Sequence, residues 1–180
     1  MSQIKVNSII PVAGVPTGGG GGVVQTIMGE QRSNVSFSIA SGATSSSAAL
    51  SAQITPTSNT SKVKISGNIT CGLSNPSNSV YIKIYKNGSS LSASSSSESA
   101  GSRQTGVHAS QMVDHSWQMA SIPFSFLDSP STTSQITYQI YVSHSSGGSQ
   151  NVYINYSSDD SNNGAYARAA SFMVLEEVSA

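Results

Sequence analysis

A strict alternation of apolar and polar residues, with a period of two, is the feature that most constrains the fold. Between Ile136 and Val142 every second residue is apolar or aromatic, and the residues between them are Thr137, Gln139 and Tyr141. Successive side chains of a strand point to opposite faces, so this pattern predicts a strand with one face in a core. An apolar segment at 122–127 precedes it across Asp128-Ser-Pro130, and the two together predict a hairpin in the middle of an antiparallel sheet.

The same alternation recurs along the chain, at residues 35–39, 62–71, 80–85 and 151–156, with shorter apolar runs at 23–28 and 50–55. Residues 171–178 are apolar on both faces, which favours a central strand or a strand against another subunit. Asn87-Gly88 predicts a tight turn with positive φ at both residues, and residues 111–127 are expected to form a strand bent at Pro123. Together, these alternating segments and turns predict about eight to ten strands in an all-β, antiparallel two-sheet sandwich that is jelly-roll-like.

Residues 1–22 differ from the rest and are expected to form an extended N-terminal arm on a domain that covers 23–180. Pro11 and Pro16 rule out a helix, and Gly18–Gly22 predict a flexible tether. An arm with this composition gains stability from a partner's sheet edge or groove. The glycine run lacks the Gly-Lys-Ser/Thr ending of a phosphate-binding loop, so we interpret it as a linker. The apolar docking residues are Ile4, Val6, Ile9, Ile10, Val12 and Val15.

Charge is scarce, at 9% of residues with eight basic and eight acidic side chains, against about 25% in ordinary soluble domains. No cluster of Lys and Arg is present, which argues against a nucleic-acid partner. No apolar run approaches the roughly 18 residues of a membrane span. No charged segment leads into an apolar segment in the way that is typical of a signal peptide. We therefore expect a protein made in a cytoplasm and not inserted in a membrane.

Few side chains suggest chemistry. Cys71 is the single cysteine and lies on the apolar face of its predicted strand, so a buried structural thiol is expected. The three histidines, His108, His115 and His144, lack metal-ligand spacing. Asp159 and Asp160, with Asn162 and Asn163, offer oxygens to calcium but lack the full calcium-loop pattern. No serine-nucleophile elbow occurs, and no cofactor or catalytic residue is predicted.

Seven tyrosines leave two interpretations open, packing on half-buried strands or contact with sugar rings. Packing is favoured for any single one of them.

Several segments resemble small, fibre-like structural proteins of tailed bacteriophages, in particular those of aquatic and cyanobacterial phages. They are IKVNSIIPV (4–12), GVPTG (14–18), ITPTS (54–58), SKV (61–63), FLDSP (126–130), TY (137–138) and ASFMVLE (170–176). The resemblance implies a homotrimeric β-knob whose arm docks on the virus particle, and it implies no catalytic residues. The trimer also suits strand faces rich in Ser, Thr and Asn, because closed symmetry hides sheet edges.

We therefore expect a virion structural protein, a tail-fibre-like knob assembled in the host cytoplasm together with other tail or capsid proteins. The loops at 95–106 and 157–164 are the candidates for contact with host surface glycans, and their residues of interest are Glu98, Arg103, Asp159, Asp160, Asn162 and Asn163. Two alternatives stay open, a capsid decoration or cement protein and a free carbohydrate-binding module.

Overall fold

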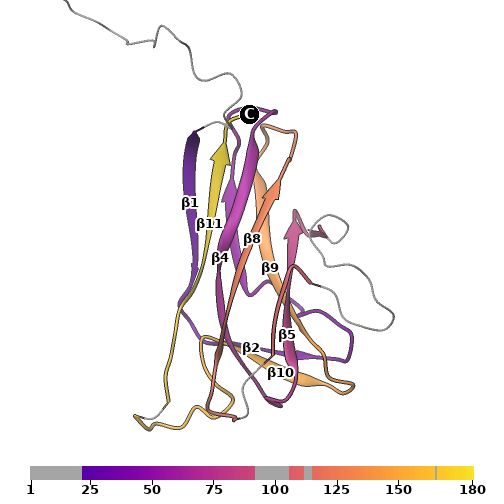
Figure 1. Cartoon of the computed structure of the whole chain (residues 1–180), viewed down its shortest axis with the longest axis vertical. Helices are drawn as coiled ribbons and strands as arrows, with labels where there is room; N and C mark the ends of the chain where they lie inside the picture. Colours follow the sequence, from indigo (N-terminus) through magenta and orange to yellow (C-terminus); the bar gives the residue numbers. More distant parts are fainter. Residues whose placement is uncertain (1–21, 92–105, 112–114, 165) are drawn as a thin grey trace, which may run out of the picture.

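A computed structural model describes residues 22–91, 106–111, 115–164 and 166–180, with only the backbone given for 108–111. The docking residues of the arm, together with Glu98 and Arg103, lie outside the described residues. The described residues form strands and connections without a helix (Figure 1). The strands are β1 (Val23–Gln31), β2 (Val35–Ile39), β3 (Leu50–Ile54), β4 (Lys62–Leu73), β5 (Ser79–Lys86), β6 (Ser89–Ser90), β7 (His108–Gln111), β8 (Ala120–Asp128), β9 (Ile136–His144), β10 (Gln150–Ile154) and β11 (Ser171–Val178).

The strands form two sheets, and every pairing is antiparallel. Sheet A has the order β1-β11-β4-β10-β2, with β8 on the other side of β4, and sheet B has the order β3-β9-β5-β6, with β7 also paired to β5. The long strand β4 pairs β11 through residues 62–68 and β10 through residues 71–73. The all-β, antiparallel two-sheet prediction is confirmed. The last strand is central, between β1 and β4, as its two apolar faces indicated.

Most connections cross from one sheet to the other, and this corrects the central prediction made from the sequence. The hairpin expected over 122–142 is wrong, because β8 pairs β4 in sheet A whereas β9 pairs β3 and β5 in sheet B. A Ser/Pro-rich connection reverses the chain equally well within one sheet or between two facing sheets. The turn residues therefore could not distinguish the two topologies.

The core lies between the two sheets, and the alternating strands supply it as predicted. In β9, Ile136, Tyr138, Ile140 and Val142 are at most 1% exposed, while residues 137, 139 and 141 are only partly buried. The other buried apolar residues are Phe37, Ile39, Ala49, Leu50, Ala52, Ile54, Val63, Ile65, Ile69, Cys71, Leu73, Val80, Ile82, Ile84, Ile122, Phe124, Val152, Ile154, Met173 and Leu175.

Two glycines allow close contact inside the sandwich. A Cβ on Gly29 of β1 would lie 2.6 Å from the Ser51 carbonyl oxygen of β3, so its absence lets the edges of the two sheets meet. A Cβ on Gly67 of β4 would lie 2.7 Å from the ring of Phe124, which occupies the space over its cross-strand partner. Such pairing of an aromatic ring with a glycine is a recurrent way to fill a gap in a sheet.

The tight turn at Asn87-Gly88 is confirmed, with φ of 50° and 79°, and it joins β5 to the two-residue strand β6. The expected strand over 111–127 is partly wrong. Residues 115–119 form a turn, closed by a bond from the Gln118 amide to the His115 carbonyl, and β8 begins only at Ala120. Pro123 lies inside β8, an edge strand of its sheet, where a missing N–H is tolerated.

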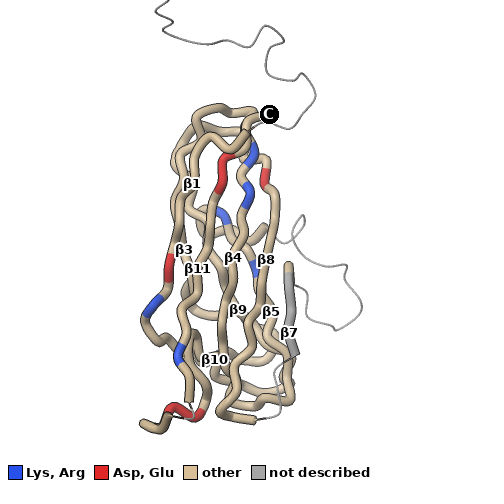
Figure 2. The backbone as a smooth tube through the Cα atoms, turned by 60° about the vertical axis from the view of Figure 1, so that its left-hand side comes forward, with Lys and Arg blue, Asp and Glu red and all other residues tan. Residues whose placement is uncertain are grey.

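The two ends of the long axis carry different parts of the chain. The beginning of β1 and the C-terminus lie together at one end, and the loop after β10 lies at the other (Figure 1). The Ser179 amide donates to the Gly22 carbonyl, so the arm leaves the domain beside the C-terminus. Charged residues are few and leave most of the tube between the ends uncharged (Figure 2).

Candidate interaction surfaces

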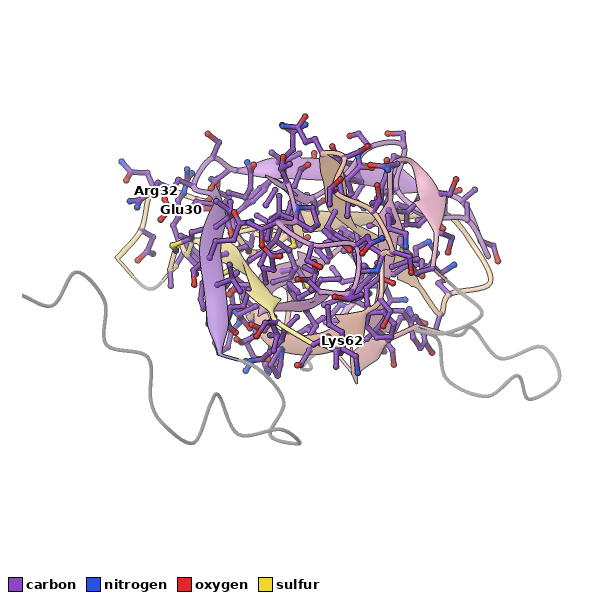
Figure 3. All side chains as sticks on the ribbon, turned by 90° about the horizontal axis from the view of Figure 1, so that it is seen from above. Glu30, Arg32 and Lys62 are labelled. Atoms are coloured by element: carbon purple, nitrogen blue, oxygen red, sulfur yellow. The ribbon has the colours of Figure 1, made fainter. Side chains whose placement is uncertain are left out.

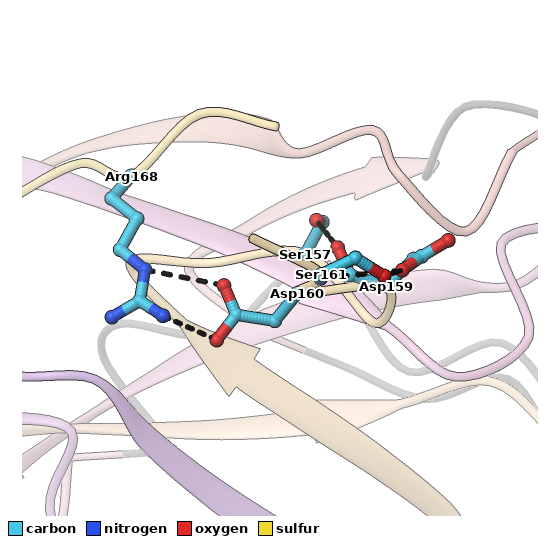
Figure 4. Close-up of polar contacts among 5 residues, drawn as sticks. All are labelled: Ser157, Asp159, Asp160, Ser161 and Arg168. Atoms are coloured by element: carbon cyan, nitrogen blue, oxygen red, sulfur yellow. Dashed lines mark hydrogen bonds and ion pairs between the residues drawn. The ribbon is translucent and has the colours of Figure 1, made fainter. Parts of the chain in front are cut away.

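The loop at 157–164 uses its carboxylates internally. The Asp159 carboxylate accepts hydrogen bonds from the Ser161 hydroxyl at 2.7 Å and the Tyr166 hydroxyl at 3.0 Å, and these bonds lower the pKa of Asp159. Asp160 accepts two hydrogen bonds from Arg168, one of them 3.1 Å from Nε (Figure 4). The loop is a folded cap in which protein donors already serve both carboxylates.

Asn155 holds the base of this loop in place. The residue is fully buried with φ of 70°, and its amide nitrogen donates to the Gln31 carbonyl at 2.6 Å and to the Ser33 carbonyl at 3.1 Å. Its side-chain oxygen accepts from the Ser171 hydroxyl at 2.7 Å. One side chain therefore connects the end of β1, the end of β10 and the start of β11. Asn162 and Asn163 are exposed on the same loop.

The tyrosines divide between core and surface. Tyr138 is buried, whereas Tyr81, Tyr85 and Tyr141 are half-buried on the outer face of sheet B. The rings of Tyr85 and Tyr141 lie 4.2 Å apart, centre to centre, and tilted. Lys83, directly opposite Tyr141, reaches the Thr44 hydroxyl at 3.3 Å, and its partial burial lowers its pKa. The outer tyrosines thus pack mainly against one another and the sheet.

The two histidines whose side chains are described divide in the same way, one in the core and one on the surface. His144 is 1% exposed, with Nε2 2.8 Å from the Ile39 carbonyl and Nδ1 accepting from the Ser146 amide. It therefore belongs to the core, where both of its nitrogens are engaged. His115 is exposed and stacks on Trp117, and the side chain of His108 is outside the described part.

Cys71 is fully buried, as predicted. Burial raises the pKa of its thiol to about 12, so the reactive thiolate is absent at neutral pH. The part of the chain that the structure describes holds no group of three or more His, Cys, Asp or Glu residues placed to bind a metal. It also contains no helix long and apolar enough to cross a membrane.

A buried carboxylate fixes the point where the arm leaves the domain. Glu177 of β11 is 0% exposed. Its Oε1 accepts from the amide and the hydroxyl of Thr57, both at 2.8 Å, and its Oε2 accepts from the Gln25 amide at 2.6 Å. Burial raises the pKa of Glu177, but the hydrogen bonds from Gln25, Ser61 and Thr57 outweigh it and hold the pKa at about 2.

This polar cluster joins three parts of the chain at the arm-exit end. Gln25 lies two residues after the start of β1, and its amide also donates to the Thr55 carbonyl in the loop before β4. Glu177 was not predicted to have this role. The signal was available, because the period of two places Glu177 on the same face as Met173 and Leu175, inside the core.

The outer face of sheet A carries an apolar stripe, made of Met28, Phe172 and Val174. Met28 in β1 lies directly opposite Val174 in β11, and Phe172 follows on the same face. Met28 is 56% exposed and Phe172 is 41% exposed. Val23 and Val24 near the arm exit are also exposed, but Thr26 and Glu176, which lie opposite each other, separate them from the stripe.

Ion pairs border the stripe at both ends. Lys64 and Glu176 pair at 2.8 Å on the side of the arm exit. Glu30 and Arg32 pair on the other side and point away from the sandwich when it is viewed down its long axis (Figure 3). An apolar patch with a polar rim is typical of a protein interaction site.

No protein-family model and no curated protein matches the chain. Among solved structures, the crystal structure of the infectious bursal disease virus VP2 subviral particle is similar over 87% of this chain, with 15% identity and a TM-score of 0.44. The structure of the Gx strain of the same virus is similar over 87% of this chain, with 14% identity and a TM-score of 0.40. The chain matches 40% of each of those longer chains.

Proposed function

We propose that this chain is a non-enzymatic structural protein of a bacteriophage particle, a knob that its N-terminal arm attaches to other virion proteins. The observation that carries the proposal is the apolar stripe on sheet A, which includes Met28 of β1, the strand that continues the arm. This protein has few charged residues, so Ser, Thr and Asn provide most of its polar surface. An exposed apolar patch on such a surface marks a contact with another protein.

The arm exit supports the same role. The Glu177 cluster holds the first residues of β1 against β11 and the 55–61 loop, so a pull on the arm would be transmitted to the central strand of sheet A. An attachment point in a particle must resist such a load. The carboxylates of Asp159, Asp160 and Glu177 are engaged in structural bonds, which suits a structural part better than an enzyme.

We favour a tail-fibre-like role, in which the protein is a homotrimer and the end opposite the arm exit faces the host. The loop at 157–164 lies at the end of the long axis opposite the arm exit (Figure 1). A knob attached by its arm would therefore present this loop outward, and its exposed Asn162 offers an amide donor and acceptor to a host glycan.

The capsid decoration or cement role is the alternative within the same particle. An arm with an apolar face and a charge-poor knob suits the stapling of neighbouring shell subunits equally well. Protection of particles against heat or osmotic shock by the added protein would favour this version. Glycan binding that is lost on substitution of Asn162, with folding retained, would favour the fibre.

Deletion of residues 1–22 tests the proposal. The shortened chain keeps every strand of the sandwich, so we expect it to fold and to be absent from purified phage particles. Full-length protein carrying Ser51→Ala, an exposed change on sheet B, serves as the control and should be incorporated. A shortened chain that is still incorporated at the normal level would contradict attachment through the arm, and a free carbohydrate-binding module would keep its sugar binding after the deletion.

A further inference from the structure

The apolar stripe of Met28, Phe172 and Val174 has an occupant of matching chemistry in the chain itself. Residues 4–12 carry one charge, Lys5, and in an extended conformation Ile4, Val6, Ile10 and Val12 fall on one face. An extended segment with one apolar face complements a flat apolar stripe on a sheet. We propose that the stripe of one copy binds residues 4–12 of a second copy, so that arms are exchanged between subunits. This inference rests on the proposed function, and it makes a second copy of the knob one of the virion proteins that the arm contacts.

The reach of the arm is sufficient for this exchange. Five glycines span roughly 12 Å as a flexible chain, and residues 4–17 span up to about 45 Å when extended. The nine residues of β1 measure about 30 Å. An arm that starts at Gly22 therefore has the length to lie along a strand of a neighbouring subunit placed beside the arm exit.

The direction of β1 favours the neighbour over the same copy. β1 starts at the arm exit and runs from there along the sheet (Figure 1). To cover its own stripe, the arm would have to reverse completely within the tether. A subunit placed beside the same end takes up the arm without a reversal.

Disulfide trapping between differently tagged chains tests the exchange directly. One full-length chain carries Val6→Cys and the other carries Val174→Cys, and the native Cys71 is fully buried and does not compete. The matched control replaces Val174→Cys with Ser51→Cys, which is exposed on the outer face of sheet B. We expect a mixed-tag disulfide with residue 174 in at least about tenfold higher yield than with residue 51. Equal yields, or a disulfide formed only within a single chain that carries both V6C and V174C, would overturn the proposal.

A pair of charge substitutions provides the second test. Met28→Glu with Phe172→Glu places two charges on exposed positions of the stripe, outside the core, and circular dichroism verifies that the variant is folded. Light scattering should show an assembly for the natural protein and a monomer for this variant. The control, Ser51→Glu with Gln53→Glu on sheet B, should assemble normally. A natural chain that is monomeric, or an assembly that survives M28E/F172E, would overturn the proposal.

The two proposals fail separately. These measurements use purified protein, whereas the proposed function is tested on particles. Arm exchange without incorporation into particles would refute the proposed function alone, and incorporation without exchange would refute this inference alone.

Discussion

The hydroxyl of Tyr138 donates a hydrogen bond of 2.6 Å to the carboxylate of Asp128, and this bond joins the two sheets of the sandwich. Tyr138 belongs to β9 in sheet B, and Asp128 ends β8 in sheet A. Lys86 at the end of β5 pairs with the same carboxylate oxygen at 2.9 Å. Burial, together with this bond to Asp128, raises the pKa of Tyr138, so the phenol stays protonated and remains a donor.

Replacement of Tyr138 by Phe should therefore lower the free energy of unfolding by about 1–3 kcal/mol, because a largely buried carboxylate loses a donor. Denaturant unfolding at neutral pH measures this loss. The matched control is Tyr141→Phe, whose ring is half-buried on the outer face of sheet B, and it should change the free energy by less than about 0.5 kcal/mol. Equal effects of the two variants would contradict a structural role for the Tyr138–Asp128 bond.

Glu177 makes stability depend on pH. Its pKa in the folded protein is about 2, below the ordinary value of 4.5. The folded state therefore binds this proton less readily than the unfolded chain does. The stabilisation is complete above about pH 4.5, disappears as the pH falls toward 2, and amounts to on the order of 2–3 kcal/mol at neutral pH.

The variant Glu177→Gln should lose this stabilisation at pH 7 and unfold with a weaker dependence on pH between 5 and 2. The new amide would face the donors of Thr57 and Gln25, which adds to the cost. Its neighbour Glu176 provides the control, because its ion pair with Lys64 is exposed and E176Q should cost less than about 1 kcal/mol. Parallel pH profiles for E177Q and the natural protein would refute the assignment.

Gly67 should not tolerate a side chain. A Cβ there would overlap the Phe172 carbonyl oxygen and lie 2.9 Å from the Met173 Cα, and these backbone atoms cannot move without displacing β11. Gly67→Ala should destabilise the fold by about 2–3 kcal/mol. Gly147→Ala, with open space around the site, should be neutral or slightly stabilising. Thermal unfolding distinguishes the two, and a neutral G67A would show that β4 and β11 are not so closely packed.

Cys71 should resist thiol reagents in the folded protein. Burial raises its pKa to about 12 and keeps reagents away from the sulfur. At pH 8 an aromatic disulfide reagent should react with less than about one thiol per ten folded chains within an hour, because the thiol becomes accessible only through local opening. After unfolding in guanidinium, the reagent should react with the thiol of every chain. Rapid reaction in the folded state would show that the second half of β4 is open to solvent.

Much of the fold could be predicted from the sequence, because a half-buried strand has a period of two. The core faces of β4, β5 and β9 follow that pattern directly. The turn at Asn87 could be predicted because only a few residue types adopt positive φ there. The partners of the strands could not be predicted, since an alternating pattern defines a buried face but not which sheet it belongs to.

The candidate surfaces were harder to predict, because they depend on contacts between segments that are distant in the sequence. Asn155 was expected on the polar face of the strand at 151–156, and its buried bonds to Gln31 and Ser171 depend on contacts between distant segments. Asp159 and Asp160 were expected to face a ligand but are bound by Tyr166 and Arg168, residues just beyond the predicted loop. The apolar stripe could not be predicted, because the register between β1 and β11 determines that Met28 lies opposite Val174.

Electron microscopy of intact phage particles labelled with an antibody against residues 30–180 is the most direct test of the central claim. Our account predicts label on the particle. Label confined to the tail would identify a fibre or adsorption protein, and label spread over the head would identify a decoration protein. Particles without label, with the protein found only in the soluble fraction of the lysate, would contradict a structural role in the virion.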